Sequence, residues 1–288
     1  MPRCAFLTMD SLEGFQTSDH LLLAPMAEAG WPVEMVSWRD TGADWDRYDA
    51  VVVRTPWDYQ DDPAAFLATL ERIDASSARL ANDLALMKWN LDKRYLRDLD
   101  GRGVAIVPTR WREVWDDAAA DGAFAAFGVE EIVVKPVVAA GARDTFRLTR
   151  NALDLQRDTL ARLFAHRAHM IQPFVTSVVT AGEYSLFYFG GALSHTIVKR
   201  PRPGDFRVQE EHGGILSRHT PDAALAAAGA TALAALGAPP LYARADFVLW
   251  QDRPVMIEFE LVEPSLYLDC DADAPARFVA AFLAWWDS

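Results

Sequence analysis

Two apolar segments near the C-terminal end, LYARADFVLW and PVMIEFELVE, restrict the fold of this 288-residue chain more than any other part of it. Only the three residues QDR separate them, a spacing typical of a β-hairpin. Residues two positions apart in a strand point to the same face of a sheet. Each segment carries two charged residues at that spacing, so the sequence predicts a hairpin with its charges on one face.

The register of this hairpin decides which charges meet. A three-residue loop places Asp246 opposite Glu258 and Arg244 opposite Glu260. A loop one residue longer would instead bring Phe259 opposite Asp246 and separate the charges. We therefore expect three carboxylates and one guanidinium to lie together on the sheet.

Clustered carboxylates repel one another and raise each other's pKa unless cations lie among them. A site made only of oxygen ligands favours Mg²⁺ or Mn²⁺ over zinc, and carboxylate-held Mg²⁺ usually also binds substrate phosphates. The alternative is a solvated sheet face with acidic residues alternating outward. The alignment with Arg244 favours the metal hypothesis, in which Asp246, Glu258 and Glu260 hold two Mg²⁺ ions, with Mn²⁺ as a substitute.

Lys135 lies in a second unusual segment, VVKPVVAAGARDTF, at residues 133–146. A lysine among β-branched residues is costly to bury unless an anion meets it. The small residues that follow would let backbone N–H groups approach such an anion, although the segment does not match a P-loop. Phosphate is one candidate anion, and an edge-strand lysine that prevents aggregation is the alternative.

The first ninety residues alternate between strand and helix patterns. CAFLTM, PVEMVSW and YDAVVVRT predict strands, and the last of these is apolar without interruption, as in a parallel sheet. Ser18 or Asp19 is expected to begin one helix, which Gly30 ends, while Asp62 and Pro63 begin another. This order predicts a doubly wound α/β domain.

The remaining chain predicts two α+β units. Their expected elements are a helix over 88–101, strands over 104–109, 133–138 and 170–175, a hairpin over 182–200 that turns at Gly190 and Gly191, an Ala-rich helix capped by Thr220, Pro221 and Gly237, and a helix over 272–286. We expect an N-terminal domain at 1–85, a central lid subdomain at 86–175 and a C-terminal subdomain with the metal site at 176–288.

Residues 201–214 form a long expected loop, which at this length is usually functional or mobile. We expect it to close over the site as a lid that excludes water. His212, beside Gly213 and Gly214, is a candidate contact for phosphate or substrate, and an exposed loop histidine is the alternative.

Arg54, Trp57 and Asp58 follow the C-terminal end of a predicted strand, where ligands bind in open α/β sheets. Arg54 is a candidate partner for a substrate carboxylate, and Asp58 for an ammonium group. The alternative is a turn that enters the next helix, with Trp57 packed in the core.

Composition limits the class of protein. The net charge of -13 disfavours a nucleic-acid partner, and the 51% apolar content predicts a sizeable core. The two cysteines, Cys4 and Cys270, are expected to be reduced, as in a cytoplasmic protein. No signal peptide and no apolar run of roughly 18 residues is found, so no membrane partner is expected, and the oligomeric state stays open.

These residues together resemble the ATP-grasp superfamily over about residues 85–288. The resemblance implies ATP as cofactor, with Lys93 and Lys135 on its phosphates, Glu183 near the ribose, and Arg244 on a tetrahedral oxyanion. Asp246, Glu258 and Glu260 match the metal carboxylates of the family, whose third position is often Asn. The adenine strand of the family resembles MIQPFV, where the backbone of Gln172, Pro173 and Phe174 would bind the purine.

YDAVVVRTPWDY, KWNLDKRYLRDL, PTRW and ELVEPSLYL resemble a narrower group, the ligases related to the O-ureido-serine cyclo-ligase of cycloserine biosynthesis. The resemblance implies that ATP phosphorylates a carboxylate of a small amino-acid-like substrate and that an amine of the same or another molecule then attacks. Glu263 and Ser265 are expected on the substrate, and Arg200 and Arg207 as further groups that stabilise the acyl-phosphate. The alternatives are a nucleotide-binding sensor without catalysis and a phosphotransferase that stops at phosphorylation.

Overall fold

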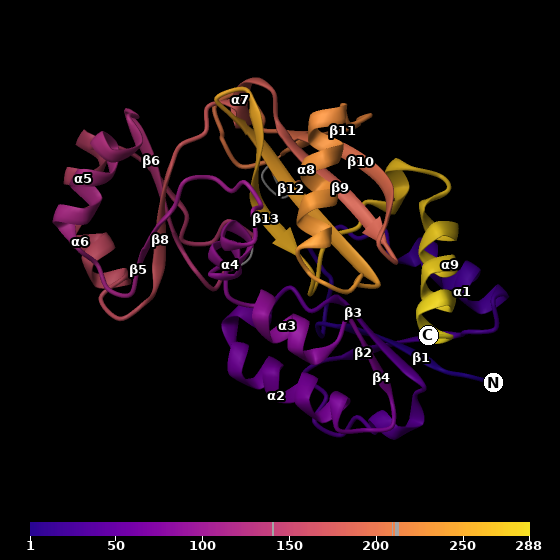
Figure 1. Ribbon diagram of the computed structural model, residues 1–288. Coiled ribbons are helices and arrows are strands. Elements are labelled where there is room, and N and C mark those ends of the chain that lie inside the picture. The colour runs from indigo at the N-terminus through magenta and orange to yellow at the C-terminus, as the bar shows by residue number, and fades with distance from the viewer. Residues whose placement is uncertain (140, 209, 211–212) are drawn as a thin grey trace.

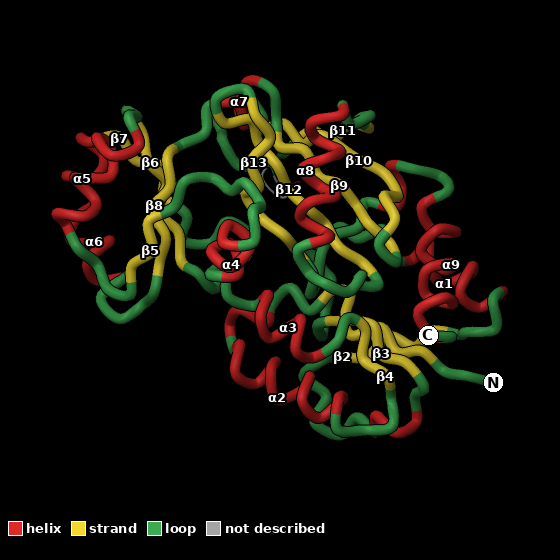
Figure 2. The backbone as a smooth tube through the Cα atoms, viewed as in Figure 1, coloured by secondary structure: helices red, strands yellow, loops and turns green. Residues whose placement is uncertain are grey.

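The computed structural model describes residues 1–139, 141–208, 210 and 213–288. Its strands form three sheets, and helices cover them in separate layers (Figures 1 and 2). The sheets take their strands from residues 4–81, 110–173 and 183–260. The fold is mixed α/β, as predicted, while the proposed domain boundaries at 85 and 175 stay a prediction.

The N-terminal sheet is parallel, with the order β2-β1-β3-β4. Its strands are β1 (Cys4–Thr8), β2 (Val33–Ser37), β3 (Ala50–Thr55) and β4 (Arg79–Ala81). The helices beside it are α1 (His20–Glu28), α2 (Pro63–Asp74) and α3 (Leu84–Asn90). The doubly wound α/β arrangement expected from the sequence is therefore present.

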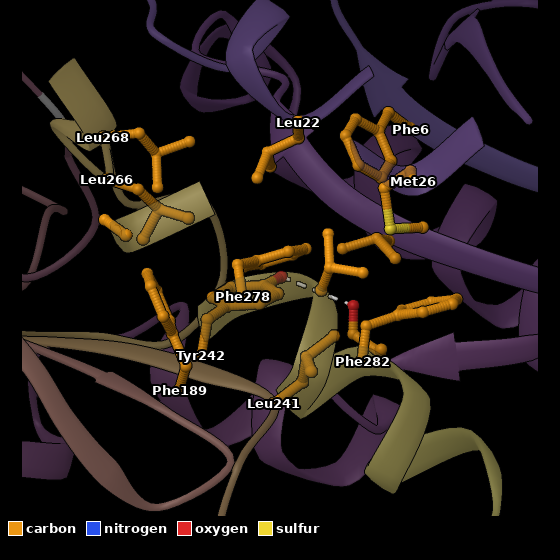
Figure 3. Close-up of a cluster of buried hydrophobic side chains, with 14 of the residues drawn as sticks. Phe6, Leu22, Met26, Phe189, Leu241, Tyr242, Leu266, Leu268, Phe278 and Phe282 are labelled. Atoms are coloured by element: carbon orange, nitrogen blue, oxygen red, sulfur yellow. Dashed lines mark hydrogen bonds between the residues drawn. The ribbon is translucent and has the colours of Figure 1, made fainter. Parts of the chain in front are cut away.

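Alternate residues of this sheet pack into two different cores. Leu7 and Val53 face α2, whereas Phe6 and Val52 face the opposite side with α1. The last helix, α9 (Ala274–Trp286), packs on that second side together with α1 (Figure 3). The C-terminal helix thus completes the core of the N-terminal sheet, which the order of the chain does not reveal.

The second sheet is antiparallel, and its order is β5-β8-β6-β7. It consists of β5 (Arg110–Arg112), β6 (Glu131–Pro136), β7 (Phe146–Thr149) and β8 (His169–Pro173). On one face lie α5 (Asp117–Phe127) and α6 (Arg150–Leu163), as Figure 1 shows. Ile132 and Val134 point into that core, so Val133 and Lys135 lie on the opposite face.

The third sheet is also antiparallel, with the order β11-β10-β9-β12-β13. Its strands are β9 (Glu183–Phe189), β10 (Ala192–Arg200), β11 (Ile215–Arg218), β12 (Tyr242–Trp250) and β13 (Arg253–Glu260). The helices are α4 (Tyr95–Gly101), α7 (Ser177–Thr180) and α8 (Ala223–Ala234). Ala243 and Ala245 face α4 and α8, so Arg244 and Asp246 face the other way.

The turn of the β12–β13 hairpin differs from the prediction. Trp250 pairs with Arg253, so the loop has two residues, Gln251 and Asp252, with φ of 51° and 61°. Positive φ at both positions is typical of the type I′ turn that suits a hairpin. The three-residue loop was wrong because the chain uses this tighter turn.

A β-bulge restores the predicted register at the charged residues. The pairing shifts between Asp246 and Phe247, so that Ile257 is an extra residue in β13. Beyond the bulge, Asp246 lies opposite Glu258 and Arg244 opposite Glu260, as predicted. The bulge also places Ile257 in the cavity lining beside Glu258, whereas strict alternation along the strand would turn it to the opposite face.

The single helix expected over 88–101 is two helices. α3 ends at Asn90 and α4 begins at Tyr95. The side chain of Asn90 bonds to the backbone of β13, and the Lys93 N–H donates to Val137 O at 2.8 Å, so the chain leaves the helical path. This break brings Lys93 to the cavity.

Two smaller expectations were also wrong. Residues 104–109 make only an isolated bridge, Ile106 to Met256, because the regular strand starts at Arg110. The N-cap of α8 is Asp222, whose carboxylate accepts from Leu225 N at 2.8 Å, rather than Thr220 or Pro221.

Among the described helices, none is long and apolar enough to cross a membrane.

Candidate active site

A cavity of about 340 Å³ lies between the second and third sheets and the loops of the N-terminal part. Strand residues of the second and third sheets contribute to its walls, and the N-terminal part contributes from the segments after β1 and β3, with Phe15, Trp57 and Tyr59 among them. Its charged lining includes Lys93, Lys135, Glu183, Lys199, Arg207, Arg244, Asp246, Glu258, Glu260 and Glu263. This concentration of both signs of charge in one cavity makes it the candidate active site.

Three carboxylates of the β12–β13 hairpin converge at one end of the cavity. One oxygen from each of Asp246, Glu258 and Glu260 lies within 4.8 Å of the others. Asp246 is buried and the two glutamates are half-buried, so the cluster is not a solvated sheet face. Oxygen ligands at this spacing fit a hard divalent cation such as Mg²⁺.

Arg244 holds two members of this cluster. Its Nε donates to Asp246 Oδ2 at 3.0 Å and its Nη2 to the same oxygen at 2.9 Å. The same Nη2 also donates to Glu260 Oε1. The remaining nitrogen, Nη1, donates to Ser265 O at 3.4 Å, which is a longer bond than those of the other two nitrogens, so it is the donor most available to a ligand.

The two glutamates of the cluster differ in electrostatic environment. Burial raises the pKa of Glu260 to about 8, and Arg244 offsets this only in part. Burial also raises the pKa of Glu258, but Lys93 and Lys135 outweigh it and leave that pKa below its ordinary value. Without a bound cation, therefore, Glu260 is the carboxyl that retains a proton near neutral pH.

Lys93 and Lys135 approach the cluster from the facing side. Lys93 Nζ lies 2.8 Å from Glu258 Oε1 and donates to Ala139 O at 2.7 Å. Burial lowers the pKa of Lys135, which has no carboxylate partner within ion-pair distance among the residues that the structure describes. An unpaired ammonium group in a cavity is suited to an anionic ligand.

A second part of the cavity lining is largely apolar. Val107, Phe174 and Ile257 line it, and the guanidinium of Arg147 stacks 3.7 Å from the Phe174 ring centroid. Gln172 also lies there and donates to Thr109 Oγ1 at 2.9 Å. A flat, mostly apolar ligand such as a purine would suit this part.

The backbone of the predicted adenine strand is only partly available to a ligand. Gln172, Pro173 and Phe174 all line the cavity. The Phe174 N–H, however, donates to Glu131 O at 2.9 Å inside the sheet. A purine would therefore have to use other backbone groups of this segment.

A third part of the lining comes from the N-terminal domain and the segment after β13. Trp57 lines the cavity and donates from Nε1 to Glu263 O at 2.9 Å. Burial raises the pKa of Glu263 to about 7, although a hydrogen bond from Tyr59 opposes the shift. Ser265 lies beside them in the lining. This polar corner is the candidate substrate pocket.

Sequence comparison identifies the relatives of this chain. A family model described as the N-terminal domain of D-cycloserine synthetase DcsG matches residues 4–82. The cycloserine biosynthesis protein DcsG of Streptomyces lavendulae is 37% identical over 278 residues, which cover 90% of this chain and 92% of that protein. The chain belongs to the D-cycloserine synthetase family.

Solved structures agree with this family assignment. A crystal structure of D-cycloserine synthetase DcsG superposes with a TM-score of 0.88 at 33% identity, covering 99% of each chain. A Bacillus anthracis D-alanine–D-alanine ligase complexed with ATP superposes with a TM-score of 0.70 at 15% identity, covering 99% of this chain and 97% of that one. The second likeness shows the fold alone, and solved structures named as ATP-grasp proteins share the same fold.

In this member of the D-cycloserine synthetase family, Lys199 is a cavity residue that the sequence reasoning missed. Its ammonium group lies 2.6 Å from Glu183 Oε1 and 3.6 Å from Asp246 Oδ1. The neighbouring Arg200, which we had named instead, is exposed, lies outside the cavity lining and reaches Ser217 Oγ at 3.4 Å. Alternation along β10 allows only one of these two side chains to face the cavity.

A bulge in the β9–β10 hairpin hid Lys199 from the sequence analysis. With the two-residue turn at Gly190 and Gly191, an uninterrupted hairpin would place Glu183 opposite Val198. The pairing shifts between Leu193 and His195, and Glu183 lies opposite Lys199. The signal that could have found Lys199 was a buried lysine in an apolar strand, the same signal that singled out Lys135.

Two predicted substrate residues lie outside the cavity lining. Arg54 is fully buried against Asp19, and Asp58 accepts from Trp38 Nε1 at 2.6 Å and from Arg39 Nε at 2.8 Å. The structure therefore gives both side chains protein partners rather than a place beside a ligand. Of the three residues chosen because they follow a strand end, Trp57 lines the cavity, and Arg54 and Asp58 do not.

Of the residues expected in the lid, some line the cavity and others do not. Arg207 lines the cavity, and its Nη2 lies 2.9 Å from Asp205 Oδ2. Gly213 and Gly214 do not line it, and His212 lies outside the described residues.

Proposed function

We propose that this member of the ATP-grasp ligases forms a C–N bond between a carboxylate and an amine of a small amino-acid-like substrate, with ADP and phosphate as products. The observation that carries the proposal is one cavity in which three oxygen-ligand carboxylates face two lysines and an arginine. Binding alone would not require the arginine beside the metal cluster.

Asp246, Glu258 and Glu260 would hold two Mg²⁺ ions. When bound, these ions would neutralise charge on the phosphate oxygens, which is the main requirement of phosphoryl transfer. Lys93 and Lys135 would hold the α- and β-phosphates, because both ammonium groups reach the cavity from the side facing the cluster. The fold is shared with a D-alanine–D-alanine ligase that has been solved with ATP, which supports this placement of nucleotide.

Arg244 would stabilise the oxyanion that forms when the amine attacks the acyl-phosphate. Two of its nitrogens are held by Asp246 and Glu260, which orient the guanidinium, and Nη1 makes the longest bond of the three nitrogens. A donor held in position before the reaction costs little reorganisation during it. Lys199, which lies between Glu183 and Asp246, would add positive charge at the same place.

The substrate would occupy the polar corner formed by Trp57, Glu263 and Ser265. A half-buried carboxylate such as Glu263 is suited to an ammonium or amine group. The relatives named as cycloserine synthetase and cycloserine biosynthesis protein support an O-ureido-serine substrate and a ring-closing reaction. The segment 201–214 would close over the substrate, because Phe206, Arg207 and Val208 already line the cavity.

An ADP-release assay with product mass analysis tests this function. The purified protein is incubated with ATP, Mg²⁺ and each member of a panel of amino acids. The panel includes both enantiomers of ureido and aminooxy analogues. ADP release that depends on one substrate, with a product lighter than the substrate, or than the two joined substrates, by the mass of one water, supports the ligase, because one carboxylate oxygen leaves in the phosphate. Nucleotide binding without turnover would indicate a sensor, and a stable phosphorylated product would indicate a phosphotransferase.

A further inference from the structure

β13, the strand that carries Glu258 and Glu260, is the edge strand of its sheet in the described part of the chain. β12 pairs with one side of it. On the other side, backbone bonding is limited to Met256, which bonds to Ala105 O at 2.8 Å and to Val107 N at 3.0 Å. The peptide groups around both glutamates therefore depend on something other than a neighbouring strand.

Side chains from the break between α3 and α4 take the place of that strand. Asn90 Nδ2 donates to Phe259 O at 2.7 Å, and Asn90 Oδ1 accepts from Leu261 N at 2.8 Å. These are the two peptide groups on either side of Glu260. One carboxamide thus donates and accepts once each, as the backbone of a paired strand would.

Tyr95 likewise bonds to the backbone of the edge strand, next to Glu258. The Phe259 N–H donates to Tyr95 Oη at 2.8 Å, and this N–H belongs to the peptide group that joins Glu258 to Phe259. Asn90 and Tyr95 are both buried, so no bulk water competes for these bonds. Lys93, which lies between them in sequence, pairs with the Glu258 carboxylate itself.

We propose that Asn90 and Tyr95 are positioning residues that hold the edge strand so that Glu258 and Glu260 meet one metal site together with Asp246. A bulge at Ile257 lies directly before the two glutamates and locally interrupts pairing with β12. Without the side-chain bonds, the bulged edge strand could shift and carry the glutamates away from Asp246. Partners that orient metal ligands in this way typically contribute about 10–100-fold to metal affinity.

This inference rests on the proposed metal role of the three carboxylates, so its test is designed to separate the two. The readout is binding of Mn²⁺ in the presence of saturating ADP, followed by the electron paramagnetic resonance signal of free Mn²⁺. The variants are Asn90→Ala and, as a matched control, Asn82→Ala. Asn82 is also buried and bonds to the residue that follows β13, at Leu261 O, beyond both glutamates.

Both asparagine variants should lose stability, because each leaves buried backbone groups without a partner. Only Asn90→Ala should weaken Mn²⁺ binding, by about tenfold, whereas Asn82→Ala should change it less than about threefold. Mn²⁺ binding that is weakened by similar factors in the two variants, or unchanged in Asn90→Ala, would overturn the positioning role. If Asn90→Ala gives no folded protein, Tyr95→Phe replaces it. The Mn²⁺ affinity of Tyr95→Phe is then compared with that of Asn82→Ala.

Glu258→Gln separates failure of this inference from failure of the proposed function. If that variant binds Mn²⁺ as tightly as the parent protein, the metal site itself is wrong and the positioning role falls with it. If Glu258→Gln loses Mn²⁺ while Asn90→Ala and Asn82→Ala behave alike, the metal site stands and only the positioning role is wrong.

Discussion

The region around Arg54 and the region around Arg244 both bury an arginine against an aspartate. They differ in how far neighbouring protein groups pair with the buried charges. Arg54 is fully buried, contacts Asp19 at 3.0 and 3.1 Å and donates to Pro264 O at 3.0 Å. Its guanidinium also lies 5.2 Å from the ring centroid of Tyr242. The hydrogen bonds to Asp19 and Pro264 occupy both Nε and Nη2 of the guanidinium, so the pair joins β3 to the segment after β13.

The Arg244 region leaves charges facing a cavity. Asp246 and Glu260 contact the guanidinium, yet Lys135 has no ion-pair partner among the described residues and Glu260 is held at a raised pKa by burial. Burial of ionisable groups without full compensation is typical of functional sites. The comparison indicates that a buried arginine marks a ligand site only where neighbouring charges remain unsatisfied by protein.

The largest expected effect on activity comes from Glu258→Gln. The amide keeps the shape of the side chain but removes the negative charge that a metal requires, so turnover should fall by at least about a hundredfold. The amide oxygen of the new side chain can still accept a hydrogen bond from Lys93 Nζ, as Glu258 Oε1 does at 2.8 Å, so the melting temperature should change little. A fall in melting temperature with no loss of ADP release would contradict the metal role.

The largest expected effect on stability comes from Arg54→Met. Removing the cation leaves Asp19 buried without a partner, which should lower the free energy of unfolding by roughly 3–5 kcal/mol in urea denaturation. The double variant Arg54→Met/Asp19→Leu should recover most of this loss. Loss of substrate binding at unchanged stability would show instead that Arg54 belongs to the active site.

Lys135→Ala should have a smaller effect that falls on the ligand. Burial already lowers the pKa of this lysine, so its removal should not destabilise the folded protein. Affinity for ATP should fall by about tenfold, equivalent to roughly 1.4 kcal/mol. Calorimetric titration with the nucleotide measures this, with Lys88→Ala on the surface as a control. Equal affinity in the two variants would remove Lys135 from the nucleotide site.

A further expected effect, which leaves the ligand sites intact, is on the pH dependence of stability in the metal-free protein. Burial raises the pKa of Glu260 from 4.5 to about 8, so the folded state binds a proton over this range that the unfolded state releases. The free energy of unfolding should therefore fall as pH rises from about 4.5 to about 8, by on the order of a few kcal/mol.

Glu260→Gln provides the control for this pH dependence. Urea denaturation in a chelating buffer at pH 5.5 and 8.5 should show a larger loss in the parent protein than in the variant. A parallel response of the two proteins would mean that Glu260 ionises normally in the folded state.

Sequence reasoning predicted the N-terminal strands well and the active site less evenly. The runs around Phe6 and Val52 are apolar on both faces, and such runs belong to buried parallel strands. The register of Asp246 and Glu258 was right, although the predicted loop was wrong, because the tighter turn and the bulge offset each other. Local rules do not predict a bulge, so the agreement in register was partly a coincidence of two offsetting errors.

The errors arose where distant partners decide the outcome. Arg54 was placed with substrate because nothing near it in sequence reveals its contact with Asp19. The helix break after Asn90 was missed because its cause is the backbone of β13, more than 160 residues away. Lys199 was missed because a second bulge sets its position opposite Glu183.

The central claim is that the β12–β13 carboxylates gather magnesium and nucleotide in one cavity. Calorimetric titration of ADP, with and without Mg²⁺, into the parent protein and Glu258→Gln tests it most directly. The parent protein should bind ADP at least about tenfold more tightly with Mg²⁺, and Glu258→Gln should lose that gain. Equal affinity with and without Mg²⁺ in the parent protein, or an undiminished gain in Glu258→Gln, would contradict the claim.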